Sequence, residues 1–306
     1  MTSKILCIKS TGSSFEDWFS LKFREHDCDI IGWQEFYDAG SDRYLGEGIK
    51  RLIVLCKNAR KIVKKYSINS YDKIIIFDKY DIFLSLLPFV DSKKIFLYMW
   101  NSLGIKQGNF LKALNKVWNK RMYTFDSGDA KRYQLEYNTQ FYFFDKIELQ
   151  KEGKGLFFIG QDKERYHLLK NLKQVCLEHN LVYDFKIVPS LDASYDEADK
   201  DLIYNGFLPY DQVRASVKKC EAVVDLVQKG QVGLTIRSME AMIYNKKIIT
   251  NNASLKEQPF FNENMIFILD DRPLSELEGF LKKEGNYDQD KIWSYDYSSW
   301  IKRFHL

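Results

Sequence analysis

Residues 231–242 read QVGLTIRSMEAM, and they come shortly after an apolar run, Glu221–Val227, whose composition is typical of a buried parallel strand. The glycine-containing turn predicts the start of an amphipathic helix over Thr235–Tyr244. Apolar residues recur at helical spacing toward the core, which leaves Arg237 and Glu240 at the mouth of the helix. A strand, a turn and a helix in this order form one half of a βαβ unit.

The start of this helix also suits a phosphate-bearing ligand. Backbone N–H groups at a helix start attract phosphate oxygens, and Gly233 allows a close approach to the backbone. Thr235 is placed to cap the helix or touch a phosphate, and Arg237 offers a bidentate cation. Glu240 is placed to accept hydrogen bonds from a ribose. The segment therefore suits a nucleoside diphosphate, although each residue has a structural alternative as turn, cap or solvated charge.

The rest of the chain alternates in the same way between short apolar runs and amphipathic segments. The expected strands are Ile5–Lys9, Cys28–Trp33, Lys73–Asp78, Lys94–Trp100, Arg121–Asp126, Gly155–Gly160, Val182–Val188, Ala222–Val227, Lys247–Thr250 and Met265–Leu269. The expected helices are Phe15–Glu25, Gly48–Tyr66, Lys163–His179, Tyr210–Cys220, Thr235–Tyr244 and Leu274–Lys283. This alternation predicts βαβ units, parallel sheets and the α/β class.

A chain of 306 residues is long for one core and suits two domains. The charged run Lys146–Lys154 is the expected boundary, giving domains 1–150 and 151–289, with 290–306 packing back on the first domain. Ligands of open α/β sheets bind at the carboxyl ends of the strands, so two such domains predict a cleft between these edges.

The composition is that of an ordinary globular protein, with 45% hydrophobic and 29% charged residues. Five scattered cysteines without a CxxC pair indicate a reducing compartment, and four histidines without ligand spacing predict no metal site. No run is apolar and long enough to span a membrane, and no signal peptide is evident, so we expect a cytoplasmic protein. The net charge of +4 and the absence of a nucleic-acid-binding module disfavour nucleic acid as a partner.

Three stretches resemble GT-B glycosyltransferases, which have two Rossmann-like domains facing across a cleft. They are FIGQDKER (158–165), GFLPYDQV (206–213) and GLTIRSMEAM (233–242), and together they place the resemblance over about residues 155–255. The stretch TFDSGDA (124–130) is similar to one found in proteins of bacterial cell-surface polysaccharide synthesis. Gly230 and Gln231 stand near the place where many retaining members carry a first glutamate, so the anomeric outcome stays open.

The resemblance implies a metal-independent, hexosyltransferase-type enzyme that uses a UDP- or GDP-linked sugar and no further cofactor. It implies a glycan, glycolipid or glycoprotein acceptor in surface polysaccharide or capsule synthesis. The donor-side residues it indicates are Gly160, Lys163, Arg165, Tyr210, Gly233, Leu234, Thr235, Arg237 and Glu240. Lys163, Arg165 and Arg237 would stabilise the leaving diphosphate.

An inverting reaction also needs a base for the acceptor hydroxyl. Asp78 and Asp126, which each end an expected strand, are the candidates, with helix capping as the alternative for both. Gly12, Ser13 and Asn101 are the expected acceptor-side residues.

Two further readings of the whole chain remain. A nucleotide-sugar epimerase has the same architecture, and a GT-B-like protein without turnover would act as a binding or partner subunit. The basic face of Gly48–Tyr66 suggests a peripheral contact with an anionic membrane at its inner face, against the alternative of a solvated helix face.

Overall fold

The computed structural model of the protein describes residues 3–37, 49–118, 120–144, 153–191 and 193–304. The chain forms two compact units, one of residues 1–139 with 302–306 and one of residues 140–301. Each unit is built on its own parallel sheet.

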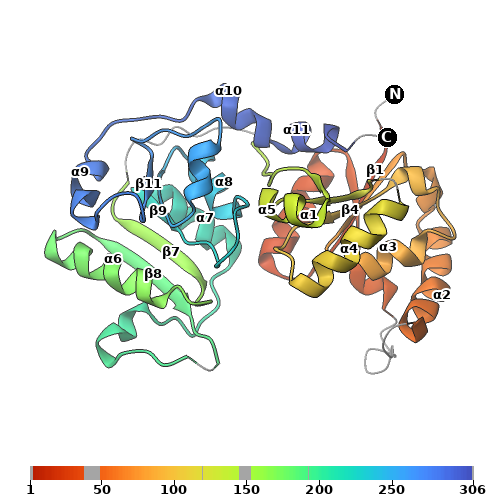
Figure 1. The fold of residues 1–306 in the computed structure, drawn as a ribbon, viewed down its shortest axis with the longest axis horizontal. Helices are drawn as coiled ribbons and strands as arrows, with labels where there is room; N and C mark the ends of the chain where they lie inside the picture. Colours follow the sequence, from red (N-terminus) through yellow and green to blue (C-terminus); the bar gives the residue numbers. More distant parts are fainter. Residues whose placement is uncertain (1–2, 38–48, 119, 145–152, 192, 305–306) are drawn as a thin grey trace. The chain divides into compact units, whose positions relative to one another are not determined.

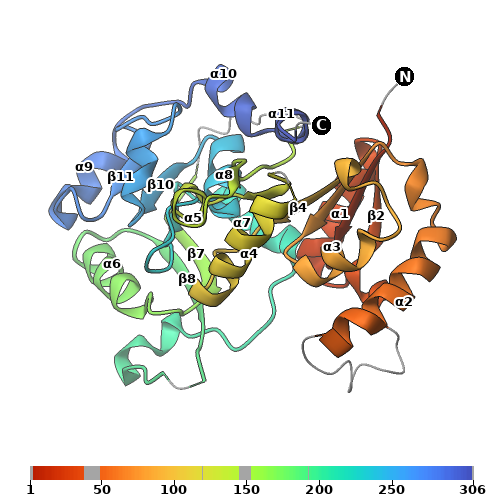
Figure 2. The same ribbon diagram turned by 45° about the vertical axis from the view of Figure 1, so that its right-hand side comes forward.

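The sheet of unit 1 (Figures 1 and 2) has the strand order β2-β1-β3-β4-β5-β6. Every neighbouring pair is parallel. Its strands are β1 (Ile5–Lys9), β2 (Cys28–Gly32), β3 (Lys73–Phe77), β4 (Ile95–Met99), β5 (Met122–Thr124) and β6 (Glu136–Tyr137). Its helices are α1 (Ser14–Glu25), α2 (Ile49–Lys65), α3 (Tyr80–Leu86), α4 (Ile105–Val117) and α5 (Ser127–Tyr133). The central strands β3 and β4 consist almost wholly of buried apolar residues, because helices cover both faces of the sheet.

The sheet of unit 2 has the order β11-β10-β9-β7-β8 and is also parallel throughout. Its strands are β7 (Leu156–Gln161), β8 (Tyr183–Val188), β9 (Ala222–Asp225), β10 (Lys247–Thr250) and β11 (Ile266–Ile268). Its helices are α6 (Tyr166–Glu178), α7 (Tyr210–Lys219), α8 (Ile236–Ile243), α9 (Leu277–Leu281), α10 (Gln289–Ile292) and α11 (Tyr297–Lys302, whose last residue belongs to unit 1). Helix α6 lies along β8, and α8 packs on β9 and β10 (Figure 1).

The expected strands and long helices are present, with ends shifted by a few residues. The pattern does not predict α3, α4 or α5. Helices α3 and α5 have seven residues each and give little periodicity, whereas α4 has thirteen. Seven short 3₁₀ helices also connect the described elements, at Trp33–Phe36, Ile68–Ser70, Ser92–Lys94, Glu197–Leu202, Ala253–Glu257, Leu274–Glu276 and Trp293–Tyr295.

The units divide between residues 139 and 140, ahead of the boundary expected at 150/151. The charged run that suggested the later boundary lies largely outside the described residues. The aromatic run that follows residue 139 belongs to unit 2, because Phe141 stacks on Trp300 with ring centroids 4.1 Å apart and Phe143 packs on Tyr297. Residues 290–301 therefore belong to unit 2, and only the last residues return to unit 1.

Candidate functional site

The strand order of each unit identifies one crevice where a ligand would bind. In unit 2 the chain runs from β7 to β8 on one side and from β9 to β10 and β11 on the other, so the order reverses between β7 and β9. In unit 1 the same reversal lies between β1 and β3. Ligands of doubly wound sheets bind outside the carboxyl ends of the strands at such a reversal. The residues that follow β7 and β9, and those that follow β1 and β3, are therefore the first candidates.

Asp225, at the end of β9, organises the start of helix α8. The Thr235 hydroxyl donates to its Oδ2 at 2.7 Å, and the Ser238 hydroxyl donates to the same oxygen. Thr235 also caps α8, since its Oγ1 accepts from the Ser238 N–H at 3.1 Å. Burial raises the pKa of Asp225, and these two hydroxyls together with Arg237 and Arg165 oppose the rise. Thr235 thus has the capping role expected of it at the reversal of the sheet.

Glu240 does not lie at the mouth of α8, as the sequence pattern suggested, but is fully buried. Its Oε1 accepts from the Tyr210 hydroxyl at 2.6 Å, and its Oε2 pairs with Arg237. Burial raises the pKa of Glu240, whereas the Arg237 charge lowers it. The pattern misplaced Glu240 because α8 is buried over the whole stretch Ser238–Ile243 rather than along one stripe. Arg237 stays partly exposed beside the helix start.

Tyr210, expected to touch the donor, instead lies in the core of unit 2. Its hydroxyl also lies 2.9 Å from the hydroxyl of Tyr142. Burial raises the pKa of both tyrosines well above the ordinary value, so both hydroxyls keep their protons at neutral pH. Tyr210 is therefore a buried hydrogen-bond donor to Glu240 and does not line the crevice.

The loop before α8 is held by side chains that follow β10. Asn252 and Ser254 donate to the carbonyl of Val232, at 3.3 and 2.7 Å. Asn252 also reaches the carbonyl of Gly233 at 3.5 Å. Gly233 and Leu234 are both buried, so the loop is a fixed part of unit 2.

The turn after β7 places Arg165 at the other side of the same crevice. Lys163 and Glu164 have left-handed backbone angles (φ 42° and 68°), and the Asp162 carboxylate closes the turn by accepting from the N–H groups of Arg165 and Tyr166 at 3.0 and 2.9 Å. Gly160 lies close to this turn, since a Cβ there would come within 3.5 Å of an Arg165 nitrogen. Lys163 is exposed.

The Arg165 guanidinium has unused hydrogen-bonding capacity. Its Nη1 donates to the carbonyl of Gln161 at 3.1 Å, while its Nε is buried and has no hydrogen-bond partner among the described residues. Burial lowers the pKa of Arg165, and the charges of Asp225 and Asp162 oppose this. A buried donor without a partner costs about 1–3 kcal/mol. An anion in the crevice would remove that cost.

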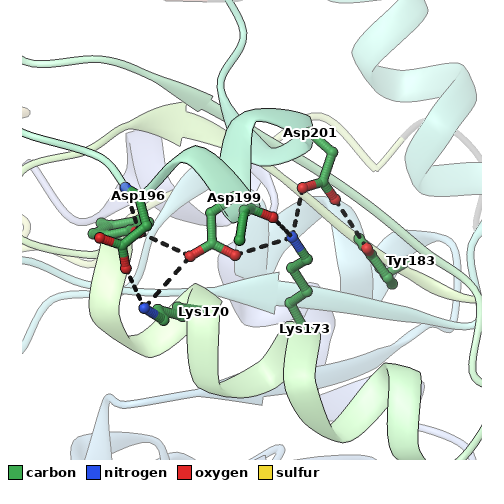
Figure 3. Close-up of polar contacts among 8 residues, drawn as sticks. Lys170, Lys173, Tyr183, Asp196, Asp199 and Asp201 are labelled. Atoms are coloured by element: carbon green, nitrogen blue, oxygen red, sulfur yellow. Dashed lines mark hydrogen bonds and ion pairs between the residues drawn. The ribbon is translucent and has the colours of Figure 1, made fainter.

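A network of charged residues fixes the segment after β8 onto α6 (Figure 3). Lys173 is 8% exposed, and its ammonium lies 2.9 Å from Asp199 and 2.5 Å from Asp201. Lys170 pairs with Asp196, and the Tyr183 hydroxyl donates to Asp201 at 2.9 Å. The Tyr195 hydroxyl extends the network to Asp162 at 2.8 Å. The segment after β8 is thereby connected to the turn that carries Arg165.

In unit 1 the loop after β1 combines a left-handed glycine with a buried lysine. Gly12 has φ +99°, and Ser13 caps α1 by accepting from the Glu16 N–H at 3.2 Å. Lys9 is almost fully buried, and its ammonium donates to the carbonyls of Ser10 and Glu16 at 2.7 and 3.3 Å. Burial lowers the pKa of Lys9 to about 8. Sequence reasoning missed Lys9, although a lysine inside an apolar strand is the signal that identifies it.

Asp78, at the end of β3, lies beside the same reversal and binds the residues that follow β4. Its Oδ1 accepts from the N–H groups of Trp100 and Asn101 at 2.7 and 3.1 Å, and its Oδ2 accepts from the Asn101 side chain at 2.8 Å. The backbone of Asp78 is left-handed (φ 58°), a conformation that costs energy for a non-glycine residue. Burial raises the pKa of Asp78 to about 6 against these hydrogen bonds. The structure brings Asp78 and Asn101 together.

Asp126, the second predicted base, caps a helix. It is buried, and its Oδ1 accepts from the N–H groups of Gly128 and Asp129 at 2.8 and 3.0 Å at the start of α5. Asp78 has no such role, since α3 begins at Tyr80 without a side-chain cap. The capping alternative therefore describes Asp126 and not Asp78.

The described residues also bear on metal binding and on membrane crossing. Among the described residues, no group of three histidine, cysteine, aspartate or glutamate side chains is arranged to hold a metal ion. Within the same residues, none of the helices combines the length and apolar character needed to cross a bilayer.

No family model matches the chain, and no curated protein matches it in sequence. Solved structures do match its fold. One is an alpha-glucosyltransferase in complex with UDP and a 13-mer DNA containing an HMU base, with 11% identity, 98% of each chain covered and a TM-score of 0.59. Another is the UDP-GlcNAc 2-epimerase of Methanocaldococcus jannaschii, with 14% identity, 98% and 97% covered and a TM-score of 0.50.

These likenesses and the two parallel sheets confirm the predicted class, an α/β protein with two Rossmann-like units of the GT-B type. At this level of identity they show the fold alone. The expectation that the chain binds no nucleic acid stays a prediction, since the glucosyltransferase structure contains DNA.

Proposed function

We propose that the protein is a glycosyltransferase that moves a sugar, of the hexosyl type, from a nucleoside diphosphate to an acceptor hydroxyl without a metal ion. The proposed acceptor is a glycan, glycolipid or glycoprotein of bacterial surface polysaccharide or capsule synthesis. The observation that supports it best is that Arg165 and Arg237 both lie near enough to Asp225, at the reversal of the unit 2 sheet, for their charges to act on its carboxylate. These are the donors that a leaving diphosphate needs.

In this proposal the bond between the anomeric carbon and the diphosphate oxygen breaks, and the negative charge that develops on the diphosphate is held by Arg165, Arg237 and backbone N–H groups of α8. Thr235 fixes the helix start, and Lys163 adds an exposed cation. A ribose contact by Glu240 would require its carboxylate to leave Tyr210 and Arg237. We therefore assign Glu240 to positioning Arg237.

Asp78 is the proposed base in unit 1. Its carboxylate would take the proton of the acceptor hydroxyl as the oxygen attacks the anomeric carbon. A pKa of about 6 suits a base that is deprotonated at neutral pH and still accepts a proton readily. This role belongs to an inverting reaction, which the anomeric configuration of the product would test by NMR.

Nucleotide binding tests the donor site directly. We expect UDP or GDP to raise the melting temperature of the parent protein, and Arg165→Gln to weaken the affinity about 10- to 100-fold, since a hydrogen bond to a charged group contributes about 1.5–3 kcal/mol. Arg165→Gln is the better variant because Arg237→Ala would also leave the buried Glu240 without its cation. Lys291→Gln, an exposed charge elsewhere in unit 2, is the matched control. Equal affinities in parent, variant and control would remove the site assignment.

Turnover assays distinguish the three functions considered for this fold, a transferase, an epimerase and a binding subunit. A transferase slowly releases nucleoside diphosphate from a nucleotide sugar without its acceptor, an epimerase changes the sugar's configuration and exchanges a proton with D₂O, and a binding subunit does neither. We expect slow release of diphosphate with water as the acceptor. Asp78→Asn should lose this release. Proton exchange into the sugar without release would favour the epimerase.

Peripheral membrane contact is part of the proposal and is supported by helix α2. Ile53 is 52% exposed on this helix, with exposed lysines around it. The protein would then work at the inner face of the cell membrane. Co-sedimentation that increases with the anionic lipid content of vesicles and decreases with salt would support this, and co-sedimentation indifferent to both would contradict it.

A further inference from the structure

A cavity of about 830 Å³ lies in unit 2 at the amino ends of its strands, the sheet edge opposite the donor crevice. Its lining includes residues one or two positions before β7, β9 and β11 or at the start of β10, such as Lys154, Glu221 and Lys247. The ends of helices α7 and α9 complete the wall. The cavity is therefore separate from every residue assigned to the proposed transfer reaction.

Lysines dominate this cavity. Lys218 and Lys219 come from the end of α7, and Lys282 and Lys283 follow α9. Lys154, Lys246 and Lys247 come from the strand side, so seven lysines face two glutamates, Glu221 and Glu284. The helix dipole favours lysines at the carboxyl end of a helix, which accounts for the lysines at the ends of α7 and α9. It does not explain Lys154, which precedes a strand.

Two of these lysines are built into the structure. Lys246 is 2% and Lys247 8% exposed, and the Lys247 ammonium donates to the carbonyls of Phe280 and Lys283 at 2.6 and 2.5 Å. Lys247 therefore fixes the segment after α9 against the sheet. Burial lowers the pKa of both lysines, which is the expected effect of a positive charge held away from water.

Other lysines of the cavity are available to a ligand. Lys154, Lys219 and Lys283 are exposed, and none of them makes an ion pair with another described residue. A concentration of like charge with few counter-charges raises the local potential and attracts an anion. Among the described residues the lining has no arginine, so a ligand would meet compact ammonium groups, which bind phosphate oxygens as point charges.

We propose that this cavity, lined by Lys154, Lys219 and Lys283 over a floor of Lys246 and Lys247, binds an anion that carries two or more phosphate groups. The phosphates belong either to a free polyphosphorylated molecule or to the headgroups of anionic lipid. Binding at this edge of the sheet leaves the donor crevice open, so the site would serve regulation or localisation. The proposal does not depend on the glycosyltransferase assignment.

Isothermal titration with tripolyphosphate tests the cavity, with Arg165→Gln carried by the parent, the variant and the control alike to weaken the proposed donor site. The triple variant Lys154→Gln/Lys219→Gln/Lys283→Gln removes three exposed ammonium groups, and its folding is verified by circular dichroism and melting temperature. The control Lys93→Gln/Lys106→Gln/Lys131→Gln makes the same charge change on exposed lysines of unit 1. We expect the cavity variant to bind at least tenfold more weakly than the parent and the control to bind within twofold of it.

Vesicles identify the source of the phosphates. Binding to phosphatidylglycerol vesicles, but not to phosphatidylcholine vesicles, that is weakened at least tenfold in the cavity variant and kept in the control assigns the lipid headgroup. If tripolyphosphate binds in the cavity but vesicle binding does not depend on the cavity lysines, the ligand is a free polyphosphorylated molecule. The proposal is overturned if the parent binds neither tripolyphosphate nor anionic vesicles, or if the cavity variant binds both as tightly as the parent does.

Discussion

Asp78 and Asp126 each follow a strand of the unit 1 sheet, β3 and β5, yet their carboxylates have different partners. Asp126 satisfies the first N–H groups of its own helix, whereas Asp78 accepts hydrogen bonds from residues that follow another strand. Asp78 also keeps a left-handed backbone and a raised pKa, two features that gather at functional sites. These differences allow paired substitutions to separate catalysis from folding.

We predict that Asp78→Asn lowers kcat at least 100-fold with little change in melting temperature, because general base catalysis contributes about 10²- to 10⁴-fold. Asp126→Ala should instead cost about 0.5–2 kcal/mol of stability through loss of the helix cap and keep most of its activity. Steady-state kinetics and urea unfolding measure both effects. The assignment is wrong if Asp126→Ala loses turnover at full stability while Asp78→Asn keeps it.

The pH profile provides a second prediction for Asp78. With a pKa of about 6 in the folded protein, the base is protonated at lower pH, so kcat/KM should fall about tenfold per pH unit below 6. The contribution of Asp78 to the free energy of unfolding should instead be larger at low pH. The folded state binds the proton more tightly than the unfolded state, so this group's contribution decreases as pH rises from about 4 to about 6, by at most about 3 kcal/mol. Asp78→Asn should remove both dependences.

The sequence identified both aspartates but could not distinguish them. A strand that ends in aspartate predicts a side chain at the carboxyl edge of the sheet, and that prediction holds for both residues. Whether the carboxylate turns to its own helix or to a neighbouring loop depends on which N–H groups come within reach after folding. Glu240 shows the same limit, because its partner Tyr210 lies thirty residues away on α7.

At the level of elements, the segment Pro189–Asn205 depends on one buried cation. The Lys173 ammonium holds Asp199 and Asp201, whereas Lys170 is 42% exposed. Although burial opposes it, hydrogen bonds from Lys173 and Tyr166 lower the pKa of Asp199. The segment is rich in aspartate, and nothing in its sequence indicates which lysines on α6 bind these carboxylates.

We predict that Lys173→Met lowers the free energy of unfolding by about 3 kcal/mol, because it removes the nearer cation of buried Asp199 and leaves only Lys170 at 3.7 Å. Lys170→Met, the matched control on the same helix, should cost less than about 1 kcal/mol, as is usual for an exposed ion pair. Urea unfolding at pH 7 measures both. Because Asp199 has a lowered pKa, the difference between the variants should shrink as pH falls below about 4. Equal costs would show that the buried pair contributes no more than the exposed one.

At the level of the whole molecule, the two sheets repeat one plan, and each unit has its own hydrophobic core. Strand-helix alternation was enough to predict both sheets, since buried parallel strands have a strong apolar signal. The division between the units was harder to predict because Gln140–Phe144 continues without charge or glycine into the core of unit 2. A boundary that is buried among aromatic rings does not have the composition of a linker.

Two separate cores imply that a nucleotide stabilises the units unequally. At a UDP concentration about 100 times Kd, binding adds about 2.7 kcal/mol to the unit that holds it, which slows exchange of amides that need its opening about 100-fold. We predict that hydrogen exchange slows in β7, β9 and α8, and that β1 and β3 keep their rates. Arg165→Gln at the same UDP concentration should lose most of this protection. Protection concentrated around Gly12 and Asp78 would place the nucleotide in unit 1 and contradict the donor assignment.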